Sequence, residues 1–311
     1  MLSHAEPLAF GQQLGQAHLW SRGYAGVRRM HWWTLAGAAV FLFICLALTL
    51  TPRIAPYDPN LQSLRDNLAW PTSRHWMGTD VFGRDVLSRL MYGGRFSVSI
   101  AAITLVVSST LGIVIGALSA RIGGLFDELA MRTVDVFLAF PDLLLALVLI
   151  ALVGPGPTTV VLALSLVGWT PFARLTRSLA LEINTKGYIE AARALGCSEV
   201  FIIFRHLIPN AWGPIFGLAL TRFGYQLIAV GSLSYLGLGV QPPASDWGSM
   251  LADSQPYMQQ FPLLVIIPGV TIFATALSVT MVGQGLSRRR VGRSAAKPLI
   301  LRTAIPPLEV E

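Results

Sequence analysis

Residues 32–50 read WWTLAGAAVFLFICLALTL, an apolar run that contains no charged side chain. A helical stretch of about 20 apolar residues is long enough to cross the hydrocarbon core of a bilayer. Further stretches of this kind occupy residues 97–118, 134–153, 158–172, 213–240 and 263–285. They do not alternate apolar and polar residues, as the strands of a membrane barrel do. The sequence therefore predicts an all-α, polytopic membrane protein with about six transmembrane helices.

The composition of the chain agrees with a membrane location. Of its 311 residues, 53% are hydrophobic and only 13% are charged, and the mean hydropathy is +0.60. Soluble domains carry about twice that share of charged residues. Cys45 lies inside the first span and Cys197 between the fourth and the fifth, so we expect no disulfide. The five histidines are scattered, and no spacing typical of a metal site occurs, so no metal is predicted.

The distribution of Lys and Arg predicts the orientation in the membrane. With six spans and the N-terminus in the cytoplasm, sixteen of the 23 basic residues lie on the cytoplasmic side and six lie outside. This bias is the one that the positive-inside rule expects, so both termini are predicted to be cytoplasmic. The net charge of +7 then follows from topology and from contact with anionic membrane lipid. No nucleic-acid partner is needed to explain it.

The predicted spans divide the chain into successive parts. These are a cytoplasmic N-terminal segment (1–31), the first transmembrane helix (32–50), a periplasmic loop (51–94), a core membrane domain (95–286) and a basic cytoplasmic tail (287–311). No apolar run with a small-residue cleavage site precedes the first span, which is therefore predicted to be an uncleaved anchor.

A charged loop inside the core domain, at about residues 186–210, has a helical pattern. Residues 187–210 read GYIEAARALGCSEVFIIFRHLIPN. The spacing predicts a short helix over 186–195 and a second helix over 198–207, separated at Gly196 by a left-handed glycine turn. Ser198 is expected to cap the second helix, and Pro209 is expected to end it. Two readings stay open from the residues alone: a contact site for another protein, or an amphipathic connector between two spans.

The spacing within this loop resembles the EAA loop of ABC importer permeases. Glu190, Ala191 and Ala192 are followed by three residues, Gly196, nine residues and then HLIP at 206–209. An aliphatic residue is usual in that family where His206 stands. The resemblance implies a type I ABC importer permease fold, with this loop as a coupling helix that docks on an ATPase subunit. The coupling residues that it implies are Glu190, Ala191, Ala192, Arg193, Gly196, His206 and Pro209.

Two other stretches resemble one subunit of the dipeptide, oligopeptide and nickel permeases. They are HWMGTDVFGRDVLSRLMYGGRFSVSI (75–100) and SLSYLGLGVQPPASDWGSML (232–251). Val230 stands where that family often has an acidic residue. The resemblance implies a permease in the bacterial inner membrane that forms half of a pathway for di- or oligopeptides, with a nickel chelate or another small solute as the alternative. It also implies these partners: a second permease subunit in a heterodimer, two ATP-binding cassette ATPases and an extracytoplasmic solute-binding protein.

The sequence contains no motif for catalysis. Its two lysines, Lys186 and Lys297, do not complete the phosphate-binding pattern G-x-x-x-x-G-K-[ST], so the chain itself is not expected to hydrolyse ATP. Neither G-x-S-x-G nor H-E-x-x-H occurs, which argues against an intramembrane hydrolase. We predict no catalytic residue and no cofactor. A secondary transporter is the alternative from another class, although it would leave the charged loop unexplained.

Two charged residues are predicted to lie within the membrane. Arg222 falls in the fifth span and Asp142 in the third. Such charges are costly and usually face a cavity or a partner, so both are candidates for the translocation pathway. The alternative for Arg222 is an interface position from which it snorkels.

Other residues predict packing and interface positions. Gly112 and Gly116 form a small-xxx-small pair that lets helices approach closely. Pro141 is expected to kink the third span. Trp32, Trp33, Trp169 and Trp247 are expected in the aromatic belts at the membrane surfaces.

Overall fold

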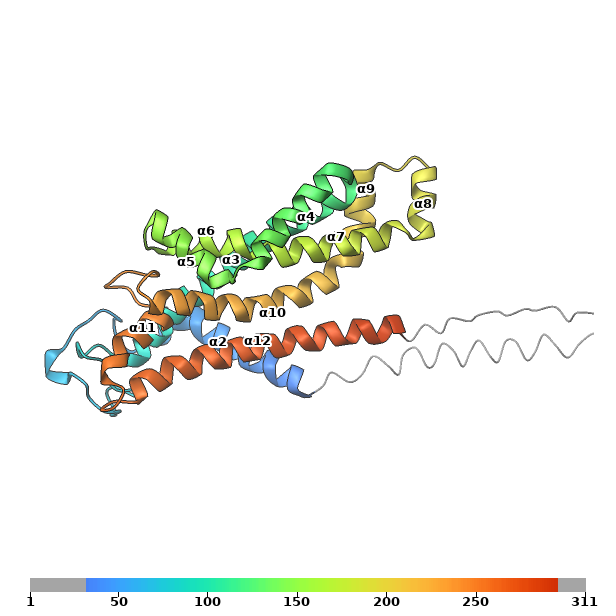
Figure 1. Cartoon of the computed structure of the whole chain (residues 1–311). Coiled ribbons are helices and arrows are strands. Elements are labelled where there is room, and N and C mark those ends of the chain that lie inside the picture. Colours follow the sequence, from blue (N-terminus) through green and yellow to red (C-terminus); the bar gives the residue numbers. More distant parts are fainter. Residues whose placement is uncertain (1–31, 296–311) are drawn as a thin grey trace, which may run out of the picture.

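The computed structural model describes residues 32–295, and its regular elements in that range are helices, apart from one isolated bridge between Thr79 and Asp85 (Figure 1). The predicted N-terminal segment (1–31) and the end of the predicted tail (296–311) lie outside the described residues. The α-helices are α2 (Trp32–Ile54), α3 (Val86–Ile122), α4 (Gly124–Ala139), α5 (Asp142–Val153), α6 (Pro157–Gly168), α7 (Thr170–Asn184), α8 (Gly187–Ala194), α9 (Glu199–Ile202), α10 (Ile208–Tyr235), α11 (Trp247–Ser254) and α12 (Leu263–Ala295).

The predicted number of spans is confirmed for the described part of the chain. Five helical stretches are long and apolar enough to cross a membrane, and α4 with α5 makes a sixth if this bent pair counts as one span. The five stretches are Trp32–Ile54, Val86–Ile122, Pro157–Asn184, Arg205–Tyr235 and Leu263–Leu286. Several boundaries differ from the predicted ones. The loop after the first span covers residues 55–85 instead of 51–94, and the backbone stays helical beyond residue 286, to Ala295.

The predicted kink of the third span at Pro141 is confirmed, and it is a complete break of the helix. The chain there forms two helices, α4 and α5, which meet at an angle of 93°. Pro141 explains the break, because proline pushes the preceding residue out of helical geometry. Phe140 accordingly has an extended backbone, with φ −108° and ψ 147°. Asp142 then lies in the first turn of α5, where a negative charge is favourable.

The close approach of α3 to α7 confirms the prediction for the glycine pair. A Cβ atom on Gly112 would lie 2.4 Å from the carbonyl oxygen of Trp169, and one on Gly116 would lie 2.3 Å from that of Ala173. Real Cβ atoms do not approach backbone this closely. The pair therefore serves helix packing within the bundle, and larger residues there would push α3 away from α7.

The largest buried cluster joins α2, α3, α5, α6, α10, α11 and α12. Trp247, at the start of α11, is buried in it, and its indole N–H donates to the carbonyl oxygen of Leu90 at 2.8 Å. Its backbone N–H donates to Ser97 Oγ at 3.1 Å. The predicted belt position of Trp247 is therefore wrong, and so is that of Trp169, which is also buried.

α2 contributes Leu48 to this cluster and lies beside α12 (Figure 1). A Cβ atom on Gly37 would lie only 2.8 Å from the carbonyl oxygen of Ser278, so these two helices are also in close contact. The first span is thereby part of the packed bundle and lies against its last helix.

Candidate functional site

The predicted coupling loop folds as two helical pieces around a glycine turn. The first piece is α8, and Leu195 ends it. Gly196 has φ +78°, in the left-handed region. Its N–H donates to the carbonyl oxygen of Arg193 at 2.9 Å, and the N–H of Cys197 donates to that of Ala192 at 3.0 Å. This pair of bonds is the Schellman motif, which needs a left-handed residue at the glycine position. The predicted turn at Gly196 is confirmed.

We call residues 186–210 the coupling segment. Its inner side is anchored in apolar contacts. Ile189 of α8, Ile202 of α9 and Leu207 are buried together with Ala180 and Ile183 of α7. Burying side chains of this size stabilises the segment by about 1.5–3 kcal/mol each. The coupling segment is therefore packed against the ends of the spans.

An ion pair fixes the angle between the two pieces. Arg193 Nε lies 2.7 Å from Glu199 Oε1, and Arg193 Nη2 lies 3.3 Å from Glu199 Oε2 and 3.1 Å from Asn184 Oδ1. The hydrogen bonds from Arg193 lower the pKa of Glu199, and the same contact raises the pKa of Arg193. Ser198 caps α9 as predicted, accepting from the N–H of Phe201 at 3.3 Å. Arg193 thus holds α8, α9 and the end of α7 together.

The outer side of the coupling segment is exposed and partly apolar. Glu190 and Ala191 are exposed on α8, whereas Ala192 is half-buried on its inner side. His206 is half-buried between two exposed aromatic rings, with centroid distances of 5.8 Å to Tyr188 and 5.9 Å to Phe201. The side chains of one short segment thus divide cleanly into an anchored face and a free face.

Pro209 does not end the second helix, and that prediction is wrong. Residues Ile203–Leu207 form a π-helical turn, in which the N–H of Ile208 donates to the carbonyl oxygen of Ile203. Pro209 then lies in the first turn of α10, directly after the π-helical turn, where the hydrogen-bond pattern of the helix changes. The backbone is therefore helical without a break from Glu199 to Tyr235.

The two motif stretches at 75–100 and 232–251 come together on the opposite end of the bundle. Asp85 caps α3 by accepting from the N–H of Ser88 at 2.8 Å, and it also lies 2.9 Å from His75 Nδ1. Gly83 has φ +69°, and a Cβ atom there would lie 1.8 Å from the carbonyl oxygen of Ser63. Only glycine fits this turn.

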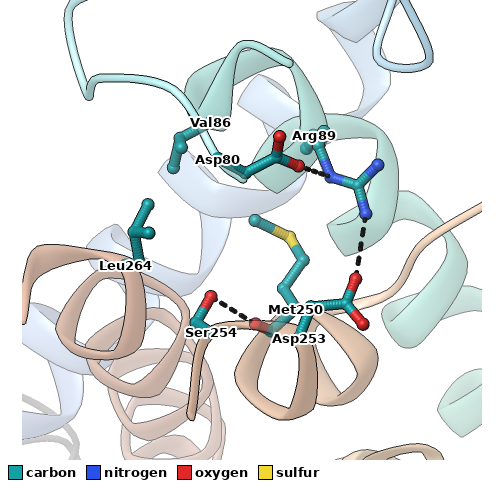
Figure 2. Close-up of a pocket in the computed structure, with 7 residues that line it drawn as sticks. All are labelled: Asp80, Val86, Arg89, Met250, Asp253, Ser254 and Leu264. Carbon is teal, nitrogen blue, oxygen red and sulfur yellow. Dashed lines mark hydrogen bonds and ion pairs between the residues drawn. The ribbon is translucent and has the colours of Figure 1, made fainter. Parts of the chain in front are cut away.

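A buried group of charges connects the first of these stretches to α11 (Figure 2). Asp80 Oδ2 lies 2.6 Å from Arg84 Nε and 3.4 Å from Arg89 Nε. Arg84 and Arg89 also lie 3.8 Å and 3.7 Å from Asp253 of α11. Both arginines are buried, and removing one member of such a group would leave an uncompensated charge. Sequence reasoning missed this group, because only the fold brings Asp253 to Arg89.

Asp246 is a second buried carboxylate that sequence reasoning missed. It caps α11 in a capping box with Ser249, and the hydroxyl of Ser234 donates to it at 2.5 Å. Burial raises the pKa of Asp246. The contact joins the end of α10 to the start of α11, so the SLSYLGLG and DWGSM portions of one motif fold onto each other.

The structure brings the two predicted intramembrane charges together. Arg222 Nη1 of α10 lies 3.6 Å from Asp142 Oδ2 of α5, and the side chains are 25% and 26% exposed. The guanidinium of Arg222 also lies 5.5 Å from the ring centroid of Tyr225. Pairing lowers the cost of both charges within a membrane. Arg222 therefore has a partner inside the bundle.

Comparison with known proteins shows the family. The chain matches the model of the binding-protein-dependent transport system inner membrane component over residues 112–293. It is 36% identical to the glutathione transport system permease protein GsiD of Pectobacterium atrosepticum, over 86% of this chain and 89% of that protein. It is 36% identical to the di/tripeptide transport system permease protein DppC of Pseudomonas aeruginosa (81% and 85%), and 33% identical to the nickel transport system permease protein NikC of Escherichia coli (82% and 92%).

Solved structures agree on the fold. A chain of the MetNI methionine ABC transporter matches with a TM-score of 0.51 at 17% identity, over 64% of this chain and 97% of that one. The chain belongs to the family of binding-protein-dependent transport system inner membrane components. It is the membrane-spanning permease subunit of an ABC importer, and it is not itself an enzyme. Such a subunit works with an ATPase and a binding protein.

Proposed function

We propose that this permease imports di- or oligopeptides and forms half of their pathway, with a second permease of similar fold as the other half. Two of the relatives above are named for the transport of peptides, glutathione and di/tripeptides, and one is named for nickel. Peptide is therefore the favoured substrate class. A nickel chelate is the alternative that the third relative supports.

The coupling segment is proposed as the contact with an ATPase subunit. The observation that carries this proposal is its division into two faces: Ile189 and Ile202 are buried against α7, whereas Glu190 and Ala191 are exposed. A segment that merely connected two spans would not need a free face held rigidly by an ion pair and a glycine turn. In this proposal Glu190, Ala191 and His206 belong to the docking surface, and Ala192, Arg193, Gly196 and Pro209 maintain its shape.

Orientation and pathway follow from the same proposal. In this proposal the coupling segment and both termini lie in the cytoplasm, and the charge group drawn in Figure 2 lies outside, on the side of the binding protein. Asp80 and Asp246 should therefore be external and Glu190 cytoplasmic. The pair Arg222 and Asp142 is proposed to border the pathway, because both side chains are partly exposed within the membrane-spanning part.

One experiment tests the coupling contact and the energy source together. The permease pair, its ATPases and the binding protein are reconstituted in vesicles, and uptake of a labelled dipeptide is measured with and without internal ATP. We expect uptake only with ATP, and we expect an Ala191→Cys variant to cross-link to an ATPase subunit that carries an engineered cysteine. Val106→Cys, on an exposed apolar position of α3, is the matched control and should not cross-link. Uptake driven by an ion gradient without ATP would instead indicate a secondary transporter.

A further inference from the structure

The bent span formed by α4 and α5 carries three aspartates, and each pairs with an arginine on a neighbouring helix. Asp127 pairs with Arg177 of α7 at 2.5 Å. Asp135 pairs with Arg174 of α7 at 2.5 Å, and Asp142 pairs with Arg222 of α10 at 3.6 Å. Apolar burial contributes little to holding this span, since Val134, Ala146 and Ile150 are its buried residues.

The middle pair differs from the others in its exposure. The side chains of Asp135 and Arg174 are each 55% exposed, compared with 20% and 31% for Asp127 and Arg177. Both residues of the middle pair nevertheless lie in stretches that are apolar and long enough to cross a membrane. An ion pair so open to its surroundings is unusual at this position.

Lipid is an unsuitable environment for this pair. A charged side chain in the hydrocarbon core costs several kcal/mol unless it faces water or a partner. Exposed positions on the other long helices are apolar, for example Leu42 of α2, Val106 of α3 and Phe273 of α12, and these suit lipid tails. The surface of α4 and α7 that carries Asp135 and Arg174 therefore faces water or protein in the assembled transporter.

The pairs Asp142–Arg222 and Asp135–Arg174 lie at successive depths along the bundle. Gly168, where α6 ends, lies against Gln226 of α10, whereas Phe172 of α7 packs with Ile215. Residues farther toward the C-terminus of α7 therefore lie beside residues of α10 that are nearer the coupling segment. Ile215 lies seven residues before Arg222 on α10, which at 1.5 Å per residue is about 10 Å nearer the coupling segment. Arg174, two residues beyond Phe172, therefore lies on that side of Arg222.

We propose that Asp135 and Arg174 line the solute pathway on the inner side of Asp142 and Arg222, and that these two pairs present matched charges to a zwitterionic solute. This inference rests on the proposed function, and it narrows the substrate class to solutes that carry both an ammonium and a carboxylate group. At each of the two pairs the carboxylate of the solute binds the arginine, and the ammonium of the solute binds the aspartate. A solute of net charge leaves one member of each pair without a partner.

Cysteine labelling tests this inference without knowledge of the substrate. The background is the full transporter in vesicles with Cys45→Ala and Cys197→Ala. Single cysteines replace Asp135 or Arg174, and reaction rates are measured with a cationic and an anionic water-soluble thiol reagent. With Arg174→Cys the remaining aspartate should favour the cationic reagent by on the order of tenfold, and with Asp135→Cys the preference should invert.

Further variants control for exposure and folding. Val106→Cys should react with neither reagent, because it faces lipid, and Leu61→Cys, exposed in the external loop, should react with both. Leu138→Cys, exposed one turn beyond Asp135 on α4, leaves the ion pair intact and should also react with both. It reports on the surface even where breaking the pair prevents folding.

Two results would overturn the inference. If Leu138→Cys and both pair variants stay unlabelled while Leu61→Cys reacts, the surface is covered by protein and lines no pathway. If the pair variants react without any charge preference, the two charges do not act on passing solutes. Failure of the proposed function is visible separately, as uptake that does not depend on ATP, and the labelling pattern does not change with that outcome.

Discussion

Replacing Gly196 by valine should disconnect the coupling segment without disturbing the membrane-spanning helices. At φ +78° an L-residue is strained by about 1–2 kcal/mol, and a β-branched side chain is among the least tolerant. No other atom lies within 4 Å of the position that the Cβ atom would occupy, so the cost comes from the backbone alone. A strain of 1–2 kcal/mol changes a local equilibrium by about 5- to 30-fold.

The ion pair that would oppose this strain is weaker. Arg193 and Glu199 are both more than a third exposed, and exposed ion pairs contribute about 0–1 kcal/mol. The strain therefore exceeds the ion pair and offsets much of the roughly 1.5–3 kcal/mol that burial of Ile189 contributes, so α8 should leave its position relative to α9 in an appreciable fraction of molecules. We expect normal insertion of Gly196→Val, but reduced co-purification of the ATPase subunits, or ATP hydrolysis without uptake.

Two further variants make the test specific. Gly187 also has open space around its Cβ position, but its φ is not in the left-handed region, so Gly187→Val should retain assembly and uptake. Gly196→Asn should recover part of the function, since asparagine tolerates the left-handed conformation. The measurements are a pull-down of the ATPase subunits and uptake in vesicles with the binding protein. Full assembly and full uptake by Gly196→Val would refute the reasoning and leave the segment as a connector.

Three other outcomes are expected. Gly83→Ala should prevent the loop before α3 from folding, because its Cβ atom would lie 1.8 Å from the carbonyl oxygen of Ser63; limited proteolysis of the purified protein should then cleave this loop. Asp246→Ala should lower thermal stability by about 0.5–2 kcal/mol through loss of the cap, whereas Asp246→Asn keeps it. Burial raises the pKa of Asp246, so protonation of this carboxyl stabilises the folded protein. This contribution is complete below the unfolded pKa of about 3.9 and is lost as the pH rises through the folded pKa. Melting temperatures measured against pH should depend less on pH in Asp246→Asn than in the parent protein. Arg222→Leu should express normally but change the uptake rate, and unchanged uptake would return Arg222 to a purely structural role.

Features that depend on local sequence signals could be predicted. The apolar runs indicated about six spans, and Leu195 followed by Gly196 indicated the left-handed turn, since both signals act within a few residues. The close packing at Gly112 and Gly116 was also predictable, because small residues at this spacing let two helices approach. The ends of the helices were less predictable, because several helices continue into polar residues beyond the apolar part of the span.

Features that depend on tertiary contacts could not be predicted. The sequence cannot show that a π-helical turn before Pro209 lets the helix continue. Tryptophan is a typical residue of the aromatic belts. Only the fold places Trp247 against α3, where its indole N–H donates to the carbonyl oxygen of Leu90. The pairing of Asp142 with Arg222 likewise requires α5 and α10 to be neighbours. Trp247, Asp142 and Arg222 were noticed, but their partners lie far away in the chain, whereas the π-helical turn lies next to Pro209 and has no recognised sequence signal.

The uninterrupted helix from Glu199 to Tyr235 has a mechanical consequence. α9 stands across the direction of α10 (Figure 1), so the long arm is the stretch Arg205–Tyr235. Its 31 residues span roughly 46 Å, so a tilt of about 5° at the coupling segment displaces the far end by about 4 Å. Its stiffness is not uniform, because the π-helical turn and the missing N–H groups of Pro209 and Pro214 remove regular hydrogen bonds near one end. Bending is therefore easiest there, while the remainder moves as a rod. The helix can therefore transmit a displacement along its length and still bend at the end nearer the coupling segment.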